Sequence, residues 1–370
     1  MHIRTIEPFA VSLPTVKPLI MAGEEVRRAD NMLVRMTSDD GHVGWGEAAA
    51  APTMTGETIA SMIAAVHYLA SGLAGRDATD IAGAVKAMGG RMYANHGAKA
   101  AIEIALHDLL GRATGRPVHA LIGNKRRSRL PLMSPIGGGD SDDDAREAVL
   151  KKASGVTAFK IKVGIDTPAN DAARTRAICA ALRNGCLISA DANQGFTTEQ
   201  AIAFVQAVAG AGLDFVEQPV AADDLDGMAA VAAATDIAVG ADEGIHSAAD
   251  VARHHERGAA GGVSLKAIKL GGIRAVVEAG RLADDLGMRV NVSCKTGESS
   301  IGCAAALHIA SVIPNVAWAL TLTHTGLAED VVTDPIPVEH GFANVLDRPG
   351  LGVEVDEDRV RRHQAPAPGV

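Results

Sequence analysis

The sequence is poor in cysteine. Its 370 residues include only four, at positions 179, 186, 294 and 303, and no two of them show Cys-x-x-Cys spacing. A disulfide framework needs a denser set, so we expect a reducing, cytoplasmic location. Charged residues interrupt the first seven positions too early for a secretory signal, which agrees with that expectation.

The sequence also lacks an excess of positive charge. It carries 35 basic against 44 acidic side chains, which gives a formal net charge of −9. Proteins that bind nucleic acid or anionic membranes usually present basic surfaces, so we expect neither partner. One basic run at 125–129 is interpreted as a solvated linker.

A clean membrane-spanning run is missing as well. Residues 299–328 contain no Asp, Glu, Lys or Arg and are numerous enough to cross a bilayer. However, Pro314 and Asn315 interrupt the stretch, and His308, Thr321 and His324 add polar groups. A buried helix, a turn and a buried strand explain it better. The composition, 47% hydrophobic and 21% charged, excludes intrinsic disorder.

What is present divides into two patterns. In the first ~125 residues we expect strands at 2–13, 32–36 and 43–45, then helices at 56–74, 78–92 and 98–115. Short β-like runs then alternate with helical patterns. There are eight of these runs, at 129–134, 158–163, 187–191, 213–217, 237–242, 262–266, 288–293 and 316–321.

A polar residue lies at or near the end of the second to the seventh run. Successive members are 24 to 29 residues apart: Lys162, Asp191, Glu217, Asp242, Lys266 and Asn291. That regular spacing is typical of a (β/α)₈-type barrel, in which the strand ends meet at one catalytic mouth. A doubly wound sheet would not normally align six such groups. The segment from residue 327 does not continue the repeat; we expect a turn and short strand at 348–353 that returns to the N-terminal domain.

Three acids would converge at this mouth. Asp191, Glu217 and Asp242 end consecutive strands, so their like charges need a cation between them. Ligation by oxygen alone suits Mg²⁺. A single acid at a strand end often only caps a helix, but three in register favour a metal site.

Lysines flank these acids. Alternation along 158–163 turns Lys160 and Lys162 into the barrel, where each should lower the pKa of the other and make a base. The other interpretation is that the run 158–163 is an exposed edge strand and that both lysines face solvent. Lys266, on the sixth run, lies across the barrel, and a substrate α-carbon would fit between it and Lys162. We favour Lys266 over Lys269, which we expect at a loop or helix start less tied to the mouth.

The ordered motifs resemble those of the enolase superfamily, within it the muconate-lactonizing-enzyme subgroup. They are Lys-Ile-Lys at 160–162, Asp-Ala-Asn at 191–193, Glu-Gln-Pro at 217–219, Ala-Asp-Glu at 241–243, Lys-Ala-Ile-Lys at 266–269 and Glu-Ser-Ser at 298–300. The resemblance covers nearly the whole chain. It implies a modified (β/α)₇β TIM-type barrel (126–325) and an α+β capping domain (1–125) completed by residues 326–370. It also implies a Mg²⁺ cofactor (Mn²⁺ being possible), a small-molecule carboxylate substrate and a homo-oligomer.

The resemblance also implies roles for individual residues. Lys162 is the acid/base, Lys266 its opposite acid/base or electrostatic partner, and the three acids hold the metal. Lys160 tunes Lys162 or binds the substrate carboxylate. The remaining implied positions are Asn193 and Glu243, which orient the site, and Glu298, which hydrogen-bonds the carboxylate side of the substrate.

The reaction stays open between several members of the subgroup. A muconate-type cycloisomerase is our leading interpretation. The alternative is a racemase, epimerase or dehydratase of an N-acylamino acid, dipeptide or proline derivative, and a catalytically silent metal-binding barrel is a third class. Dipeptide epimerases usually carry Asp-x-Asp where this chain has Thr321-Leu322-Thr323, which speaks against that substrate.

Four further residues could set specificity. Lys295 either binds a second substrate carboxylate or is a surface lysine. His324 either contacts substrate or is a satisfied histidine at a strand end. Ile20 and Met54, in expected lid loops at 18–23 and 52–56, either line the substrate pocket or serve ordinary packing.

Overall fold

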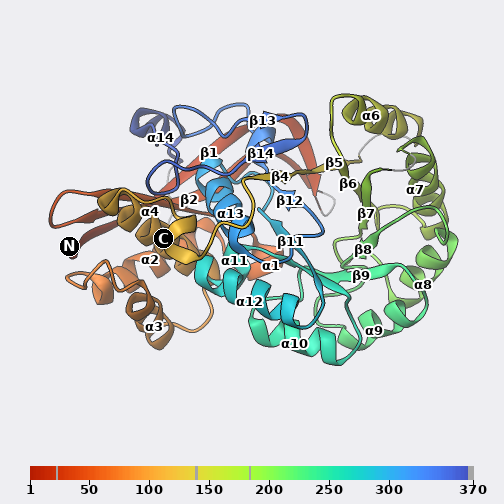
Figure 1. Ribbon diagram of the computed structural model, residues 1–370, viewed down its shortest axis with the longest axis horizontal. Coiled ribbons are helices and arrows are strands. Elements are labelled where there is room, and N and C mark those ends of the chain that lie inside the picture. Colours follow the sequence, from red (N-terminus) through yellow and green to blue (C-terminus); the bar gives the residue numbers. More distant parts are fainter. Residues whose placement is uncertain (22–23, 138–140, 183–184, 366–370) are drawn as a thin grey trace.

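The computed structural model describes residues 1–21, 24–137, 141–182 and 185–365 (Figure 1). An antiparallel sheet opens the chain, in the order β1 (Ile3–Met21), β2 (Glu24–Ser38) and β3 (Val43–Ala49). The first strand is longer than predicted because its pairing with β2 resumes at Leu19 after a register shift at Pro14. Positions 18–21 are therefore strand and not a lid loop. Residues 22–23 and the side chain of Ile20 lie outside the described part.

A series of helices follows this sheet along the chain, and two of them, those that begin at Ile59 and His96, pack on it. The series consists of α1 (Pro52–Thr55), α2 (Ile59–Leu73), α3 (Ile81–Arg91), α4 (His96–Thr114) and α5 (His119–Ile122). Thr58 and Ser61 form a capping box that begins α2. At Gly46 of β3, a Cβ atom would lie 1.9 Å from the carbonyl oxygen of Ala101, so glycine is what lets α4 lie directly on the sheet.

Eight parallel strands form the barrel and confirm the predicted fold class. They are β5 (Met133–Ile136), β6 (Ala158–Lys162), β7 (Leu187–Asp191), β8 (Phe215–Glu217), β9 (Ala238–Ala241), β10 (Gly262–Leu265), β11 (Arg289–Ser293) and β12 (Leu320–Thr321). They pair in sequence order from β5 to β12, and a bridge between Leu132 and Leu320 links the two ends. The sheet thereby comes close to closing.

The first predicted run, 129–134, splits between two sheets. Its start forms β4 (Arg129–Pro131), which pairs with β14 (Phe342–Asn344) and, through it, with β13 (Val338–Glu339). Only β5 enters the barrel. The split arises because a late segment of the chain supplies β4 with hydrogen-bonding partners outside the barrel, which sequence periodicity does not report.

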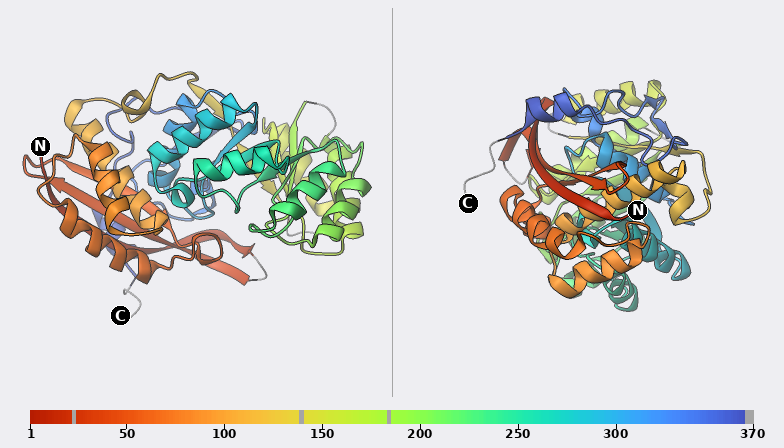
Figure 2. Two further views of the ribbon diagram at one scale, coloured as in Figure 1. Left: turned by 90° about the horizontal axis from the view of Figure 1, so that it is seen from below. Right: turned by 90° about the vertical axis from the view of Figure 1, so that its left-hand side faces the viewer.

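Helices surround the barrel strands (Figure 2). They are α6 (Ser141–Ala153), α7 (Pro168–Leu182), α8 (Thr198–Ala207), α9 (Leu225–Ala233), α10 (Ala248–Glu256), α11 (Ala267–Leu270), α12 (Ile273–Asp285) and α13 (Ser300–Val312), with a 3₁₀ turn η1 (His324–Gly326) after β12. Every residue of α13 is buried, which accounts for the uncharged stretch in the sequence. Within the described ranges, no helix has the length and apolarity to cross a membrane.

The last part of the chain packs on the N-terminal sheet and α4. The backbone N–H of Leu351 donates to Asp108 Oδ1 (2.8 Å), and Arg112 pairs with Glu354 (3.0 Å). Of the turn and short strand expected at 348–353, the turn is present at Gly350, where φ is +68°, but the strand is reduced to an isolated bridge between Gly350 and Pro117. The sequence reading also missed the helix α14 (Glu357–His363), which follows the N-cap Asp356.

Candidate active site at the barrel mouth

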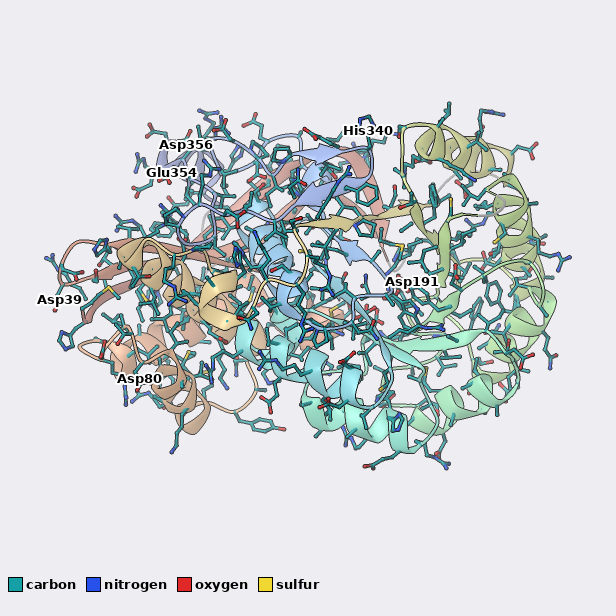
Figure 3. All side chains as sticks on the ribbon, in the orientation of Figure 1. Asp39, Asp80, Asp191, His340, Glu354 and Asp356 are labelled. Carbon is teal, nitrogen blue, oxygen red and sulfur yellow. The ribbon has the colours of Figure 1, made fainter. Side chains whose placement is uncertain are left out.

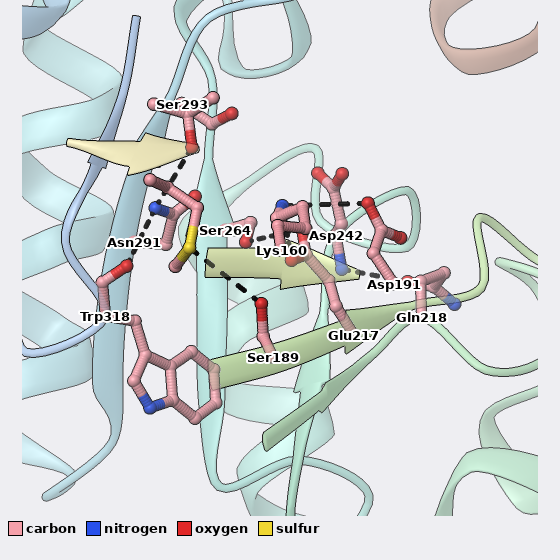
Figure 4. A network of polar contacts seen from close by, with 12 residues as sticks. Lys160, Ser189, Asp191, Glu217, Gln218, Asp242, Ser264, Asn291, Ser293 and Trp318 are labelled. Atoms are coloured by element: carbon pink, nitrogen blue, oxygen red, sulfur yellow. Dashed lines mark hydrogen bonds and ion pairs between the residues drawn. The ribbon is translucent and has the colours of Figure 1, made fainter. Parts of the chain in front are cut away.

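Strand register brings Asp191 and Glu217 to one level, and Asp242 lies two residues beyond Gly240, the partner of Glu217. Lys162 pairs with Asp191 across β6 and β7, and Asp191 pairs with Glu217 across β7 and β8. Asp242 follows the last residue of β9. All three side chains are almost fully buried. Figure 4 shows them gathered with Lys160 beside the strand ends, while Figure 3 places Asp191 in the barrel region and Asp39 and Asp80 at the opposite end of the molecule.

Two lysines of β6 contact these acids. Lys160 Nζ lies 2.5 Å from Glu217 Oε2 and 3.6 Å from Asp191 Oδ2. Lys162 Nζ lies 2.7 Å from Asp191 Oδ2, and it donates to Asn193 Oδ1 at 2.7 Å. Exposure separates the pair, since 38% of the Lys162 side chain is accessible against 9% for Lys160. The structure thus turns both lysines inward, and Lys162 is the one that a substrate could reach.

Two more lysines hold Asp242 from the other side. Lys266 Nζ lies 2.5 Å from Asp242 Oδ2, and Lys269 Nζ lies 2.6 Å from Asp242 Oδ1. Lys269 also donates to the Asp242 carbonyl and, at 3.1 Å, to that of Ser264. The prediction that Lys269 is less tied to the mouth is therefore wrong. Lys269 lies in the single turn of α11, directly after β10, and its side chain is completely buried.

The ion pairs control protonation at the mouth. Burial would raise the pKa of Asp242, but Lys266, Lys269 and Lys160 outweigh it and hold that pKa far below its usual range. Burial would likewise lower the pKa of Lys160, yet Glu217 and Asp191 outweigh it and raise that pKa. Lys162 was expected to lower the pKa of Lys160. That lowering is not found, because Glu217 and Asp191 lie close to Lys160 and raise its pKa.

A polar chain extends from these ion pairs to the next loops. Asn193 accepts from Lys162 through Oδ1 and donates through Nδ2 to Glu243 Oε1 at 3.0 Å. Burial, followed by the nearby charge of Asp242, raises the pKa of Glu243 to about 7. Gln218, which sequence reasoning did not single out, accepts from the backbone N–H of Asp242 at 2.9 Å. Its place directly after Glu217 in Glu-Gln-Pro was the available signal.

Two further inward-facing residues of the barrel strands differ in their partners. Ser264 Oγ donates to Glu217 Oε1 at 2.9 Å and so belongs to the acid cluster. Asn291 instead donates to the carbonyls of Trp318 and Ala319, at 3.0 and 2.9 Å. That side chain ties β11 to the segment before β12, deeper in the barrel (Figure 4).

The predicted specificity residues have different surroundings. Lys295 is half-buried; burial, followed by the neighbouring Lys266, lowers its pKa. His324 is buried and donates from Nε2 to the carbonyl of Ile336 (2.9 Å), whereas its Nδ1 is buried without a hydrogen-bond partner among the described residues, so both interpretations of this residue stay open. Thr321 Oγ1 accepts from Asn291 at 3.4 Å. Met54 forms part of α1, with its Sδ 3.9 Å from Lys266 Nζ.

The acid cluster suits a hard divalent cation in its chemistry. Ligands on three adjacent strands supply carboxylate oxygens only, and the ammonium of Lys160 lies where two of them meet. As the side chains lie, no group of three or more acidic, histidine or cysteine residues within the described ranges forms an assembled metal site, because the carboxylates are turned onto lysines. The residues present therefore fit Mg²⁺ in the kind of ligand they offer, while their oxygens are directed to lysine ammonium groups.

Comparison with known proteins shows the family. Residues 5–123 match the model described as "Mandelate racemase / muconate lactonizing enzyme, N-terminal domain", and residues 142–359 match "Enolase C-terminal domain-like". The chain belongs to this family. It is a member of the enolase superfamily, as the order of its motifs predicted.

Relatives of this enolase-superfamily chain catalyse different reactions. A chloromuconate cycloisomerase of Cupriavidus pinatubonensis is 33% identical over 95% of this chain and 96% of its own length. The N-succinyl-L-Arg/Lys racemase of Bacillus cereus is 30% identical over 98% of this chain and 97% of its own, and a crystal structure of that racemase superposes with a TM-score of 0.94. A dipeptide epimerase from Enterococcus faecalis, solved with Mg and L-Leu-L-Tyr, is 28% identical, with a TM-score of 0.90 over 96% of this chain and 100% of its own. The chain is therefore an enzyme of the isomerase and lyase kind.

Proposed function

We propose that this enzyme binds Mg²⁺ and moves a proton at the carbon α to a substrate carboxylate, through an enediolate. The observation that carries the proposal is the position of two lysines on either side of the acid cluster. Lys162 lies on β6 and Lys266 directly after β10, with the acid-bearing strands β7, β8 and β9 between them. A carboxylate held at the acids would present its two faces to different lysines.

The chemistry asks for this arrangement. Removing a proton next to a carboxylate places a second negative charge beside the first, so the reaction needs positive charge close by. In this superfamily a bound Mg²⁺ supplies it by stabilising the enediolate. Asp191, Glu217 and Asp242 would hold that ion. Lys160, whose pKa is raised against the effect of burial by Glu217 and Asp191, stays charged and adds a fixed ammonium.

Lys162 is then the residue that exchanges a proton with the α-carbon. It is the most exposed of the four lysines that contact the acids, and Asn193 and Asp191 keep its Nζ at the mouth. Lys266 acts from the opposite face, beneath Met54 of α1, as acid/base or as a fixed charge. Asn193 and Glu243 orient Lys162, and Glu298 would hydrogen-bond the carboxylate side of the substrate.

We infer a muconate-type cycloisomerase as the leading reaction. Lys295, two residues past the end of β11, supports it, because a dicarboxylate needs a second positive group near the mouth. Thr321 and Thr323 support it indirectly, since they offer no carboxylate to a substrate ammonium. In this reaction the remote carboxylate adds to a carbon–carbon double bond and a lysine gives its proton to the α-carbon.

A racemase, epimerase or dehydratase of an N-acylamino acid or proline derivative is the second candidate. One lysine on each face is what inversion at the α-carbon requires, and a 30% identical relative that spans 98% of this chain is a racemase. We also propose a cytoplasmic homo-oligomer whose capping domain, 1–125, is completed by 326–370 around a catalytic barrel, 126–325.

Deuterium incorporation decides between these reactions. The protein with Mg²⁺ in D₂O is offered muconates, N-acylamino acids, dipeptides and hydroxyproline derivatives, and products are followed by mass spectrometry and chirality. One deuterium gained on ring closure supports the cycloisomerase. Exchange at an unchanged α-carbon framework supports the racemase. If Lys162→Met and Lys266→Met each lose ring closure and exchange but still bind Mg²⁺, the two lysines are the groups that act on the α-carbon. Full activity in both variants would overturn the mechanism.

A further inference from the structure

Two histidines cross the boundary between the capping domain and the barrel, in opposite directions. His96, the first residue of α4, donates from Nδ1 to the carbonyl of Lys269 in α11 (2.5 Å). His246, which lies between β9 and α10, donates from Nε2 to the carbonyl of Met54 in α1 (2.9 Å). Each histidine therefore holds a backbone carbonyl that belongs to the other part of the molecule.

The rings of this histidine pair, His96 and His246, also contact each other. Their centroids lie 6.4 Å apart with an interplanar angle of 39°, which is within the range of paired aromatic rings. The ring of His96 lies against the end of α11 as well, since a Cβ built on Gly271 would be 3.7 Å from its Cδ2. The helices α1 and α11 are themselves in contact (Figure 1). The histidine pair thus forms one joint where these two short helices meet.

The backbone on which each ring is mounted is fixed. The N–H of His246 donates to Asp250 Oδ2 (3.0 Å), at the start of α10. His96 directly follows Ala94 and Asn95, which both have left-handed backbone conformations, with φ of +49° and +54°. Alanine rarely adopts this conformation, and such strain persists only where the surrounding contacts over-determine it. The local backbone therefore directs both rings to the domain boundary.

The carbonyl that His246 holds belongs to the residue that covers Lys266. Met54 Sδ lies 3.9 Å from Lys266 Nζ. Only 8% of the Lys266 side chain is accessible, against 38% for Lys162 on the other side of the acids. The helix α1 is a four-residue turn, exposed or half-buried throughout, and so short a helix depends on tertiary contacts for its stability. The hydrogen bond from His246 is one of those contacts, and it opposes movement of Met54 away from Lys266.

We propose that His96 and His246 are positioning residues that hold α1 against α11 and keep Met54 over Lys266, so that they control access of substrate to this lysine. The inference rests on the proposed function in one respect, because Lys266 receives its role there. Neither domain contains this device alone, since each histidine bonds a carbonyl of the other one. Loosening the histidine pair should therefore expose Lys266 and leave Lys162 as it is.

Substitution of His246 tests the proposal without any substrate. His246→Phe keeps an aromatic ring beside His96 but removes the donor to Met54, whereas the amide of His246→Gln can still donate from the same place. The full-length protein is treated with acetic anhydride, and mass spectrometry compares the acetylation rates of Lys266 and Lys162 in one sample. We expect this ratio to rise about five-fold in His246→Phe, the factor that corresponds to one net hydrogen bond. It should keep its original value in His246→Gln.

Further variants show whether the effect passes through the cover. The matched control is His255→Phe, at an exposed histidine of α10, and it should leave the ratio unchanged. Met54→Ala removes the cover itself and should raise the labelling of Lys266, so adding His246→Phe to it should raise the labelling no further. If His246→Phe does not fold, His96→Phe removes the other cross-domain donor and should raise the ratio. His96→Asn, whose amide can take the place of Nδ1, should not.

Kinetics separate positioning from a merely structural role. With muconate as the probe, a looser cover over Lys266 should raise KM about five-fold in His246→Phe and leave kcat nearly unchanged. A smaller fraction of folded protein would instead lower kcat and leave KM alone. If muconate is not turned over, the leading reaction is contradicted, and the acetylation ratio still decides about the histidine pair. An unchanged ratio in folded His246→Phe would overturn the proposal and leave the two histidines as domain packing only.

Discussion

The barrel mouth and the capping domain both bury carboxyl groups but give them different partners. Asp191, Glu217 and Asp242 each contact a lysine ammonium at 2.7 Å or less. Buried glutamates of the capping domain accept instead from backbone N–H groups at helix starts: Glu47 at α13, Glu57 at α4, and Glu103 from Arg274 (3.0 Å) at α12.

The difference separates a site from a scaffold. A backbone N–H is fixed in place, so a carboxylate bound to it serves to hold the start of a helix. An ammonium on a flexible chain can withdraw and leave the oxygens to another cation. Protonation follows this division only in part. Lysines lower the pKa of Asp191 and Asp242 against burial, but burial raises the pKa of Glu217 at the mouth, as it raises that of Glu103 to about 7.

Substitution at the mouth acids should have the largest effect. Glu217→Gln and Asp242→Asn remove charge where we propose the cation binds, so we expect Mg²⁺ binding to be lost and kcat/KM to fall by about 10³-fold or more. Calorimetry with Mg²⁺ and steady-state kinetics measure this. Glu57→Gln, with its backbone donors, should retain Mg²⁺ binding. If Glu217→Gln bound Mg²⁺ as tightly as the unsubstituted protein, the acids of the mouth and the buried glutamates of the capping domain would not differ in this respect.

The second-largest effect is expected when one of the buried ion pairs of Asp242 is removed. Lys269→Met removes one of two ammonium partners of a fully buried carboxylate, and we expect the free energy of unfolding to fall by about 3 kcal/mol. Denaturant titration in the presence of a chelator measures this without a competing metal. Arg257→Met is the control: it breaks an exposed pair with Asp226 (2.6 Å) and should cost at most about 1 kcal/mol. Equal losses would show that burial of the mouth pairs confers no extra sensitivity.

The pH dependence of stability tests the scaffold acids. Because the pKa of Glu103 is about 7 in the folded chain and 4.5 is its ordinary value, only the folded state holds its proton between these values. Stability should therefore fall as pH rises from 4.5 to 7, by up to about 3 kcal/mol from this group. Unfolding curves taken between pH 4.5 and 7 should show a smaller loss of stability for Glu103→Gln, by up to about the same 3 kcal/mol. Parallel curves for the two proteins would contradict it.

The smallest effect is expected at Asn193, which contacts the mouth only through its neighbours. Asn193→Gly removes the amide between Lys162 and Glu243 and suits the positive φ of +42°. Misorientation of Lys162 should lower kcat/KM by about 10- to 100-fold. The exposed Asn170, bonded to Asp166 at 3.1 Å, supplies the control variant Asn170→Gly, which should leave kinetics unchanged. A loss confined to KM would instead point to substrate binding.

Much of the fold was predictable because barrel strands repeat a simple pattern. Apolar runs ending in a polar residue every 24 to 29 positions identified the strands β6 to β11. The ends of β1, the separation of β4 from β5 and the helix α14 were not predictable. Their hydrogen-bond partners come from distant segments, as when β4 pairs with β14 more than 200 residues later.

The contacts of the candidate site were likewise predictable where local rules set them and not where distant segments meet. Residue type and spacing were enough to bring Lys160, Lys162 and Asp191 into contact, because strand alternation and register are local rules. The contact of Lys269 with Asp242 was not foreseen, because the two residues are 27 positions apart and only tertiary packing brings them together. Glu47 was missed, because its donors lie 252 and 255 residues away along the chain.

By itself the sequence determined the barrel, the family and the lysines and acids that meet at its mouth. These follow from periodicity and from motifs whose order is preserved. Only the tertiary structure decided which ammonium holds which carboxylate, how far Lys162 is exposed, and that an acid of the capping sheet reaches α13. Burial and charge pairing depend on all elements packed around a group, and that environment exists only once the chain has folded.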